Sequence, residues 1–277
     1  MTEILFAAWR RMLPMLGIAI LIFLVAPLFV IVPFSFNVEP YFSLPIPAYS
    51  MRWYAELAGS AMWHAALRNS LLIAIPTTVL ATAFGTLAAI GLTLAAFPGK
   101  GAVLALIMAP AMVPHIILGL GLFFLYAEIG LVHTLGGMIL AHTTLATPFV
   151  VLTVSATLAN FRVNLIRAGL SLGAHPVAVY RRVVLPVIMP GLLSGALFAF
   201  ITSFDEVVVA LLLSGPEYRT LPRQFWSGIQ ESISPVIMAA ASLLTLFSVA
   251  MLGLIGVIRR RERRYQAGRI DSGRQEA

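Results

Sequence analysis

The stretch RAGLSLGAHPVAVYRRVVLP, from Arg167 to Pro186, interrupts a chain that otherwise consists of long apolar runs. It holds three arginines, a histidine, two glycines and two prolines. The residues from Asn164 to Leu172 favour a helix, and Gly173 stands where a left-handed glycine commonly follows a helix end. A first short helix is therefore predicted, and Ala168 and Gly169 leave one of its faces nearly bare for close approach by a partner.

A second short helix is predicted to begin directly after this glycine. His175 suits the N-cap position, and Pro176 suits the first helical position, where the missing N–H of proline costs nothing. The helix is expected to run to about Val184, and Pro186 marks the boundary with the next apolar segment. The two short helices would form an elbow, because neither is long enough to cross a membrane.

The composition around this elbow is that of a polytopic membrane protein. Of the 277 residues, 60% are hydrophobic and 10% are charged, and the mean hydropathy of +0.96 is outside the range of soluble globular domains. The absence of cysteine excludes disulfides, haem attachment and cysteine-based metal sites. The net charge of +7 does not indicate nucleic-acid binding, since the basic residues gather at the ends of apolar segments.

Several segments are long and apolar enough to cross a bilayer, which takes about 20 helical residues. They are Leu13–Ser35, Leu67–Ala96, Ala102–Ala127, Leu135–Asn160, Val187–Leu213 and Pro235–Ile258. The first resembles a signal peptide, but it is longer than a typical signal core and no A-x-A site follows it, so we expect an uncleaved span. The prediction is an all-α protein with six transmembrane helices.

The distribution of basic residues predicts that both termini are cytoplasmic. With that orientation the remaining lysines and arginines lie inside, and the outer segments hold only Arg52, Arg68, Arg219 and Arg223. The elbow is then cytoplasmic as well. The predicted organisation is a cytoplasmic N-terminus (1–12), a transmembrane domain (13–258) with a cytoplasmic loop at about 161–186, and a basic cytoplasmic tail (259–277).

The candidate pathway residues are ionisable side chains at membrane depth. Asp205 and Glu206 lie within an apolar segment, where ionised groups are rare and usually face a cavity or a partner. Adjacent positions on a helix are about 100° apart, so we expect the two carboxylates to face different surroundings. His115, after Pro114 inside the third span, is a further candidate. The alternative is structural: an ion pair or hydrogen bond for the acids, and a packed hydrogen-bonding role for the histidine.

The spacing of the elbow resembles the EAA loop of ABC-importer permeases: E-A-A, three residues, Gly, nine residues, Ile-x-Leu-Pro. The matching positions are Arg167-Ala168-Gly169, Gly173 and Val183-Val184-Leu185-Pro186, with the leading acid, the second alanine and the isoleucine replaced. The resemblance implies a type I ABC-importer permease fold and a loop that docks into a cytoplasmic ATPase. The residues implied in this coupling are Arg167, Ala168, Gly169, Gly173, Ala174, His175, Pro176, Leu185 and Pro186.

Much of the chain resembles the polyamine-type subgroup of these permeases, particularly its second permease. The similar segments are PFSFN (Pro33–Asn37), MRWY (Met51–Tyr54), LRNSLLIA (Leu67–Ala74), SFDEVVVALLLSGP (Ser203–Pro216) and LPRQFWSGIQESISP (Leu221–Pro235). The resemblance implies a bacterial inner-membrane subunit that pairs with another, homologous permease chain. It also implies that the chain binds two ATPase subunits and receives substrate from a binding protein. ATP and Mg would be held by the ATPases, and no cofactor by this chain.

Other functions stay open at this stage. The expected substrate is a polyamine or related amine, with an opine, aminoethylphosphonate or another small solute as the alternative. A self-contained secondary transporter would need an ion-coupling site and usually inverted repeats, and no repeat is visible. No catalytic set, Walker A loop or H-E-x-x-H pattern occurs, so we expect a transport subunit and not an enzyme. The elbow itself has a simpler alternative, a linker lying on the membrane with Arg181 and Arg182 at its surface.

Overall fold

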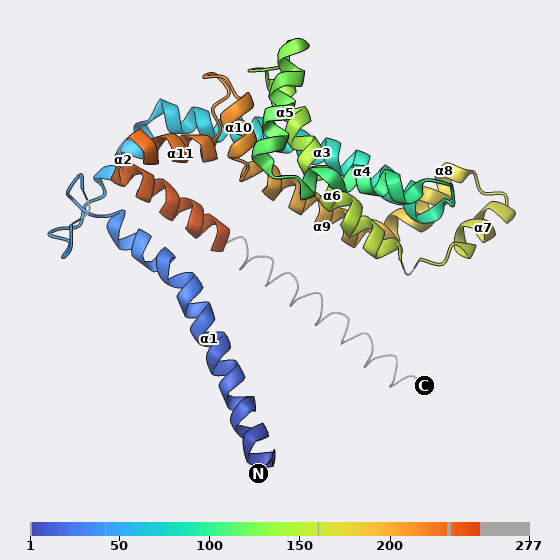
Figure 1. Ribbon diagram of the computed structural model, residues 1–277, viewed down its shortest axis with the longest axis horizontal. Coiled ribbons are helices and arrows are strands. Elements are labelled where there is room, and N and C mark those ends of the chain that lie inside the picture. Colours follow the sequence, from blue (N-terminus) through green and yellow to red (C-terminus); the bar gives the residue numbers. More distant parts are fainter. Residues whose placement is uncertain (1, 42, 160, 232–233, 250–277) are drawn as a thin grey trace. The chain divides into compact units, whose positions relative to one another are not determined.

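The computed structural model describes residues 2–41, 43–159, 161–231 and 234–249, and these are mostly helical (Figure 1). The chain divides into two compact units. One comprises Ala61–Ser227, and the other combines the flanking parts Met1–Ser60 and Gly228–Ala277.

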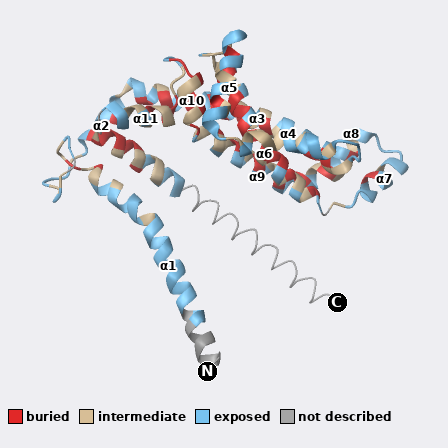
Figure 2. Ribbon diagram, viewed as in Figure 1, coloured by how far each residue is buried: buried red, intermediate tan, exposed pale blue. Residues whose placement is uncertain are grey.

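The flanking unit begins with the long helix α1 (Thr2–Phe34), which is exposed along most of its length (Figure 2). A connecting segment then leads to the short helix α2 (Arg52–Gly59). Trp53 at the start of α2 is buried, and its indole N–H donates to the carbonyl oxygen of Asn37 at 2.5 Å. The start of α2 is thereby tied to the segment that follows α1.

Within the described residues, four helices are long and apolar enough to cross a membrane: Met12–Phe34 within α1, α3 (Ala61–Leu94), α6 (Leu135–Leu158) and the continuous helix Pro176–Phe204. A fifth span results if the bent pair α4 (Lys100–Met112) and α5 (His115–Glu128) counts as one. The predicted last span begins as an apolar helix over Pro235–Val249, and its remainder, like the predicted tail at 259–277, lies outside the described residues. The all-helical, membrane-spanning prediction is confirmed, while the count of six stays a prediction.

The unit Ala61–Ser227 is built around α3, α6 and α9 (Leu185–Phe204), which pack along one another (Figure 1). Glycines permit their close approach. A Cβ on Gly195 would lie 3.1 Å from the Cα of Val150, and one on Gly191 would lie 2.8 Å from the carbonyl oxygen of Thr153. Small residues at helix contacts are typical of membranes, where van der Waals packing drives helix association.

The predicted span Ala102–Ala127 is not one continuous helix. α4 ends at Met112, α5 begins at His115, and the two are bent by 104°. Val113 is extended with ψ of 135°, the conformation that a residue before proline prefers. Pro114 has no N–H to continue the helical hydrogen bonds, so the ladder stops there. His115 therefore lies at the start of a helix, and not inside one as predicted.

The prediction of Val187–Leu213 as the fifth span is wrong at both ends. The long helix ends at Phe204, and α10 (Val208–Leu213) is a separate helix. At its other end, α9 continues without interruption into a π-helical turn and α8, Tyr180–Val184 and Pro176–Val179, giving 29 helical residues. In this π turn the N–H of Leu185 bonds to the carbonyl oxygen of Tyr180, five residues earlier.

Candidate functional site

The first arm of the elbow, α7 (Asn164–Ser171), ends at the predicted glycine. Gly173 has φ of +79°, and its N–H bonds to the carbonyl oxygen of Leu170 at 3.0 Å. The N–H of Ala174 bonds to the carbonyl oxygen of Gly169 at 3.2 Å. These are the two hydrogen bonds of a Schellman motif, which satisfy carbonyl groups left free at a helix end. The predicted local geometry is confirmed.

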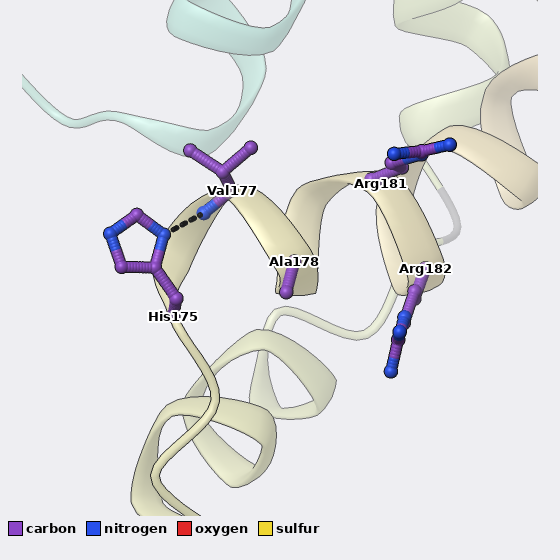
Figure 3. A pocket seen from close by; sticks show the side chains of 5 residues that line it. All are labelled: His175, Val177, Ala178, Arg181 and Arg182. Carbon is purple, nitrogen blue, oxygen red and sulfur yellow. Dashed lines mark hydrogen bonds between the residues drawn. The ribbon is translucent and has the colours of Figure 1, made fainter.

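The second arm also begins as predicted. His175 is the N-cap of α8, and its ring Nδ1 accepts a hydrogen bond from the N–H of Val177 at 3.3 Å (Figure 3). Pro176 occupies the first turn. Because Nδ1 accepts, a neutral His175 carries its proton on Nε2. The backbone is thus fixed on both sides of the short turn between the arms.

One side of the elbow is anchored in the helical core. Ile166 of α7, Val179 of α8 and Val184 of the π turn are buried in one cluster with residues of α3, α6 and α9. A Cβ on Gly169 would lie 3.1 Å from Cγ2 of Val179, so the chain's own second arm occupies part of the bare face expected to receive a partner. The elbow is a firm extension of the bundle, and Figure 1 shows α7 and α8 at its end.

The other side of the elbow is exposed. Most of the predicted coupling residues are exposed, and Gly169 and Leu185 are half-buried. Leu172 is 88% exposed and Val177 is 66% exposed, so a large apolar side chain on each side of the turn is available to a partner. Arg167, which stands where the resembling family has an acid, is exposed and has no hydrogen-bond or ion-pair partner among the described residues. We find no physical reason for this replacement.

A pocket of about 480 Å³ lies on the second arm (Figure 3). Its lining comprises His175, Val177, Ala178, Arg181 and Arg182. Both arginines are exposed, and in Figure 3 their side chains leave the helix in different directions. Guanidinium groups bind carboxylates and phosphates well, so this surface suits an acidic partner.

The structure brings two of the three candidate pathway residues together. Nδ1 of His115 lies 2.8 Å from Oε2 of Glu206. The other carboxylate oxygen, Oε1, accepts hydrogen bonds from the N–H groups of Val208 at 2.8 Å and Val209 at 3.0 Å. A carboxylate in this position satisfies free N–H groups at the start of α10 and is favoured by the helix dipole. Glu206 is accordingly 5% exposed, whereas His115 is 43% exposed.

Asp205 lies in different surroundings although it is adjacent to Glu206. It caps the end of α9 with its backbone N–H, which bonds to the carbonyl oxygen of Ile201 at 3.0 Å. Asp205 is exposed, and its carboxylate has no partner within the part of the chain that the structure describes. The two acids face different surroundings as predicted, but Glu206 lies in the break after α9 and not on a helix as expected. Any contact with substrate stays a prediction.

A polar network that no sequence pattern predicted holds the segment after α10 against α3. The amide of Asn69 donates to the carbonyl oxygens of Glu217 at 2.7 Å and Arg219 at 3.2 Å. The hydroxyl of Ser70 accepts from the N–H of Leu221 at 2.8 Å. These partners are 148 to 151 residues apart in sequence, and no spacing rule relates them. Asn69, Ser70 and Leu221 lie in segments that carry the family resemblance, whereas Glu217 and Arg219 do not.

A second contact that the sequence did not predict joins α6 to the end of α9. His142 is 1% exposed, and its Nδ1 shares a hydrogen bond of 2.9 Å with the hydroxyl of Ser203. Such a bond compensates a polar group that has lost water. Among the described residues, no group of three or more histidine or acidic side chains is arranged to hold a metal ion.

Comparison with known proteins gives the class to which this fold and elbow belong. The family described as "Binding-protein-dependent transport system inner membrane component" matches residues 81–264. The chain belongs to this family and is a permease subunit of an ABC importer, a multi-pass membrane protein.

Individual relatives refine the class. The chain is similar to the spermidine/putrescine transport system permease protein PotC of Haemophilus influenzae, with 32% identity over 239 residues, 86% of this chain and 93% of that protein. It is also similar to the putrescine transport system permease protein PotI of Escherichia coli K12, with 34% identity over 259 residues, 90% of this chain and 88% of that protein. The resemblance to the polyamine-type subgroup is thereby confirmed.

A solved structure supports the fold. The crystal structure of a bacterial ABC transporter involved in the import of the acidic polysaccharide alginate matches with a TM-score of 0.71 and 14% identity, covering 92% of this chain and 96% of that chain. At this identity the likeness shows a shared fold and carries nothing about substrate.

Proposed function

We propose that this chain is one permease of an ATP-driven importer for a polyamine or a related small amine. It would pair with a second permease, bind two cytoplasmic ATPase subunits and receive substrate from a binding protein. The observation that carries the proposal is an elbow with one side buried in the helical core and the other exposed, in a chain of this family. The names of the relatives, which refer to spermidine and putrescine, support the substrate class.

The proposed topology has six spans with both termini in the cytoplasm. The elbow at about 161–186 and the basic tail at 259–277 are then cytoplasmic, on the side where ATP is hydrolysed. The asymmetric distribution of lysine and arginine supports this orientation.

In this proposal the elbow acts as a lever. Ile166, Val179 and Val184 hold it to the core, so it moves with the bundle and not independently of it. The second arm and α9 are one helix from Pro176 to Phe204, which is roughly 43 Å long at 1.5 Å per residue. Approach of the ATPases would displace the elbow, and the continuous helix would carry that displacement to the break at Asp205–Val207.

The exposed side of the elbow is the proposed ATPase contact. Leu172 and Val177 provide apolar area, and Arg181 and Arg182 provide positive charge beside it. An apolar groove with acidic groups at its rim would complement this surface.

Asp205 is the proposed pathway acid. An ionised carboxylate at membrane depth attracts a cation strongly, because the surrounding lipid and protein screen charges poorly. Asp205 is exposed at a helix break and has no partner among the described residues, so its oxygens are free to accept hydrogen bonds from an ammonium group.

Uptake by the reconstituted importer tests this proposal. The chain is co-expressed with the permease, ATPase and binding protein of its own system, and the complex is placed in vesicles. Radiolabelled putrescine and spermidine are expected to accumulate when ATP and the binding protein are present, and omission of either serves as the control. Accumulation that follows an ion gradient without ATP would instead indicate a secondary transporter.

A further inference from the structure

Two helix breaks meet in the unit Ala61–Ser227. One separates α4 from α5 at Val113–Pro114, and the other separates α9 from α10 at Asp205–Val207. α10 packs against α5, so elements that follow the two breaks are in contact. His115 and Glu206 are the ionisable residues that pair across them, at 2.8 Å.

The bonds of Glu206 leave little of its carboxylate for another ligand. Oε1 accepts two backbone N–H groups of α10, and Oε2 faces Nδ1 of His115. An ionised carboxylate oxygen accepts but does not donate, so Nδ1 must carry the shared proton whether the ring is neutral or charged. With 5% exposure, Glu206 is also shielded from a passing solute.

We infer that His115 and Glu206 form a clasp between the two breaks, which removes Glu206 from the substrate pathway and leaves Asp205 as the open acid of the pair. The clasp is a property of the folded chain. The position of Asp205 on the substrate pathway and the chemistry of the passing solute, an amine, rest on the proposed function.

The clasp predicts how many negative charges an amine meets at this break. With His115 in place, one carboxylate is open, because Glu206 is engaged by α10 and by the imidazole. Without the imidazole, Oε2 of Glu206 becomes a second acceptor beside Asp205. His115 is therefore a positioning residue that sets the preference between amines of lower and higher charge.

Carbodiimide labelling tests the clasp without reference to transport. The full-length chain, assembled with its partner subunits in lipid nanodiscs, is treated with a water-soluble carbodiimide and methylamine, and modified peptides are quantified by mass spectrometry. We expect Asp205 to be modified and Glu206 to be protected by at least tenfold. In His115→Ala the protection of Glu206 is lost, and in His115→Asn, whose amide Nδ2 can replace Nδ1 as the donor, it returns.

Uptake kinetics provide the second readout. His115→Ala should raise the ratio of the KM for putrescine to the KM for spermidine at least threefold, and His115→Asn should leave that ratio near the unmodified value. Glu206→Gln keeps an oxygen that can accept from the N–H groups of α10, so this variant can test the clasp if His115→Ala fails to assemble. It should change the KM for putrescine less than threefold, while Asp205→Asn raises it at least tenfold.

The outcomes separate the clasp from the proposed function. Equal labelling of Asp205 and Glu206 in the unmodified chain, or protection of Glu206 that persists in His115→Ala, overturns the clasp. A KM in Glu206→Gln that rises as far as in Asp205→Asn overturns it as well. If the labelling pattern is as expected but neither amine is taken up, the clasp stands and the amine substrate is wrong.

Discussion

Gly173 is required by the conformation of the backbone and not by lack of space. A Cβ at this position would meet no atom within 4 Å, but φ is +79°. For most L-residues this left-handed conformation is unfavourable by about 1–2 kcal/mol, and asparagine tolerates it better than most. A substitution here therefore acts on the shape of the elbow and on what can approach its tip.

Replacement of Gly173 by arginine should leave the chain in the membrane but abolish co-purification of the ATPase. The bulky cation sits at the exposed tip of the proposed docking surface, and the Schellman turn is strained. Gly99→Arg is the matched control, because Gly99 also has φ of +80° with no atom within 4 Å of its Cβ position. Normal ATPase yield with Gly173→Arg, measured by affinity purification, would count against the assignment of the elbow.

Replacement of Asp205 by asparagine should raise the KM for the amine at least tenfold and leave assembly unchanged. A loss of one charge-assisted hydrogen bond of about 1.5–3 kcal/mol corresponds to this range. Glu217→Gln is the control, because Glu217 is an exposed acid outside the break. Uptake kinetics that do not change in Asp205→Asn would remove this residue from the pathway.

Helix breaks explain where sequence reasoning succeeded and where it failed at the scale of elements. The elbow was predictable because its caps depend on residues within a few positions of Gly173 and His175. The bends at Pro114 and at Asp205–Val207 were not, since an apolar run with a proline reads equally as a kinked span or as two helices. The pairing of His115 with Glu206 depends on both bends, so no local pattern revealed it.

Replacement of Gly195 by leucine should destabilise the contact between α6 and α9. Its Cβ position lies 3.1 Å from the Cα of Val150, so the helices must separate, and overpacking of this kind typically costs about 1–3 kcal/mol. Gly91→Leu on α3 is the control, because a Cβ there meets no atom within 4 Å. In thermal unfolding of the purified protein, Gly195→Leu should have a lower midpoint than the unmodified chain, and Gly91→Leu should not. Equal midpoints for the two variants would contradict this packing.

At the scale of the whole molecule, composition established the membrane class, and loop charge predicted the orientation. The chain contains no cysteine, so single introduced cysteines report their own surroundings without further mutation. The identity of the solute lies beyond both composition and fold, because one fold serves many substrates.

Cysteine labelling in intact cells should place the elbow inside. Ser171→Cys on the elbow is expected to react with a membrane-impermeant maleimide only after permeabilisation. Glu217→Cys, in a predicted outer segment, should react in intact cells. Both residues are exposed in the isolated chain, so it is expressed without its ATPase subunits, which would otherwise cover the elbow. Reaction of Ser171→Cys in intact cells would reverse the proposed orientation.

The π turn at Tyr180–Val184 determines how α8 of the elbow is rotated about the helix axis relative to α9. Bonding five residues apart accommodates one residue more than an α-helical turn, and one residue in an α-helix corresponds to a rotation of about 100°. Deletion of a single residue from this turn would leave a continuous helix but rotate the elbow about its axis relative to the face of α9 that packs on α6. In the proposed mechanism, the direction in which the ATPase would displace α9 therefore depends on the length of this five-residue segment.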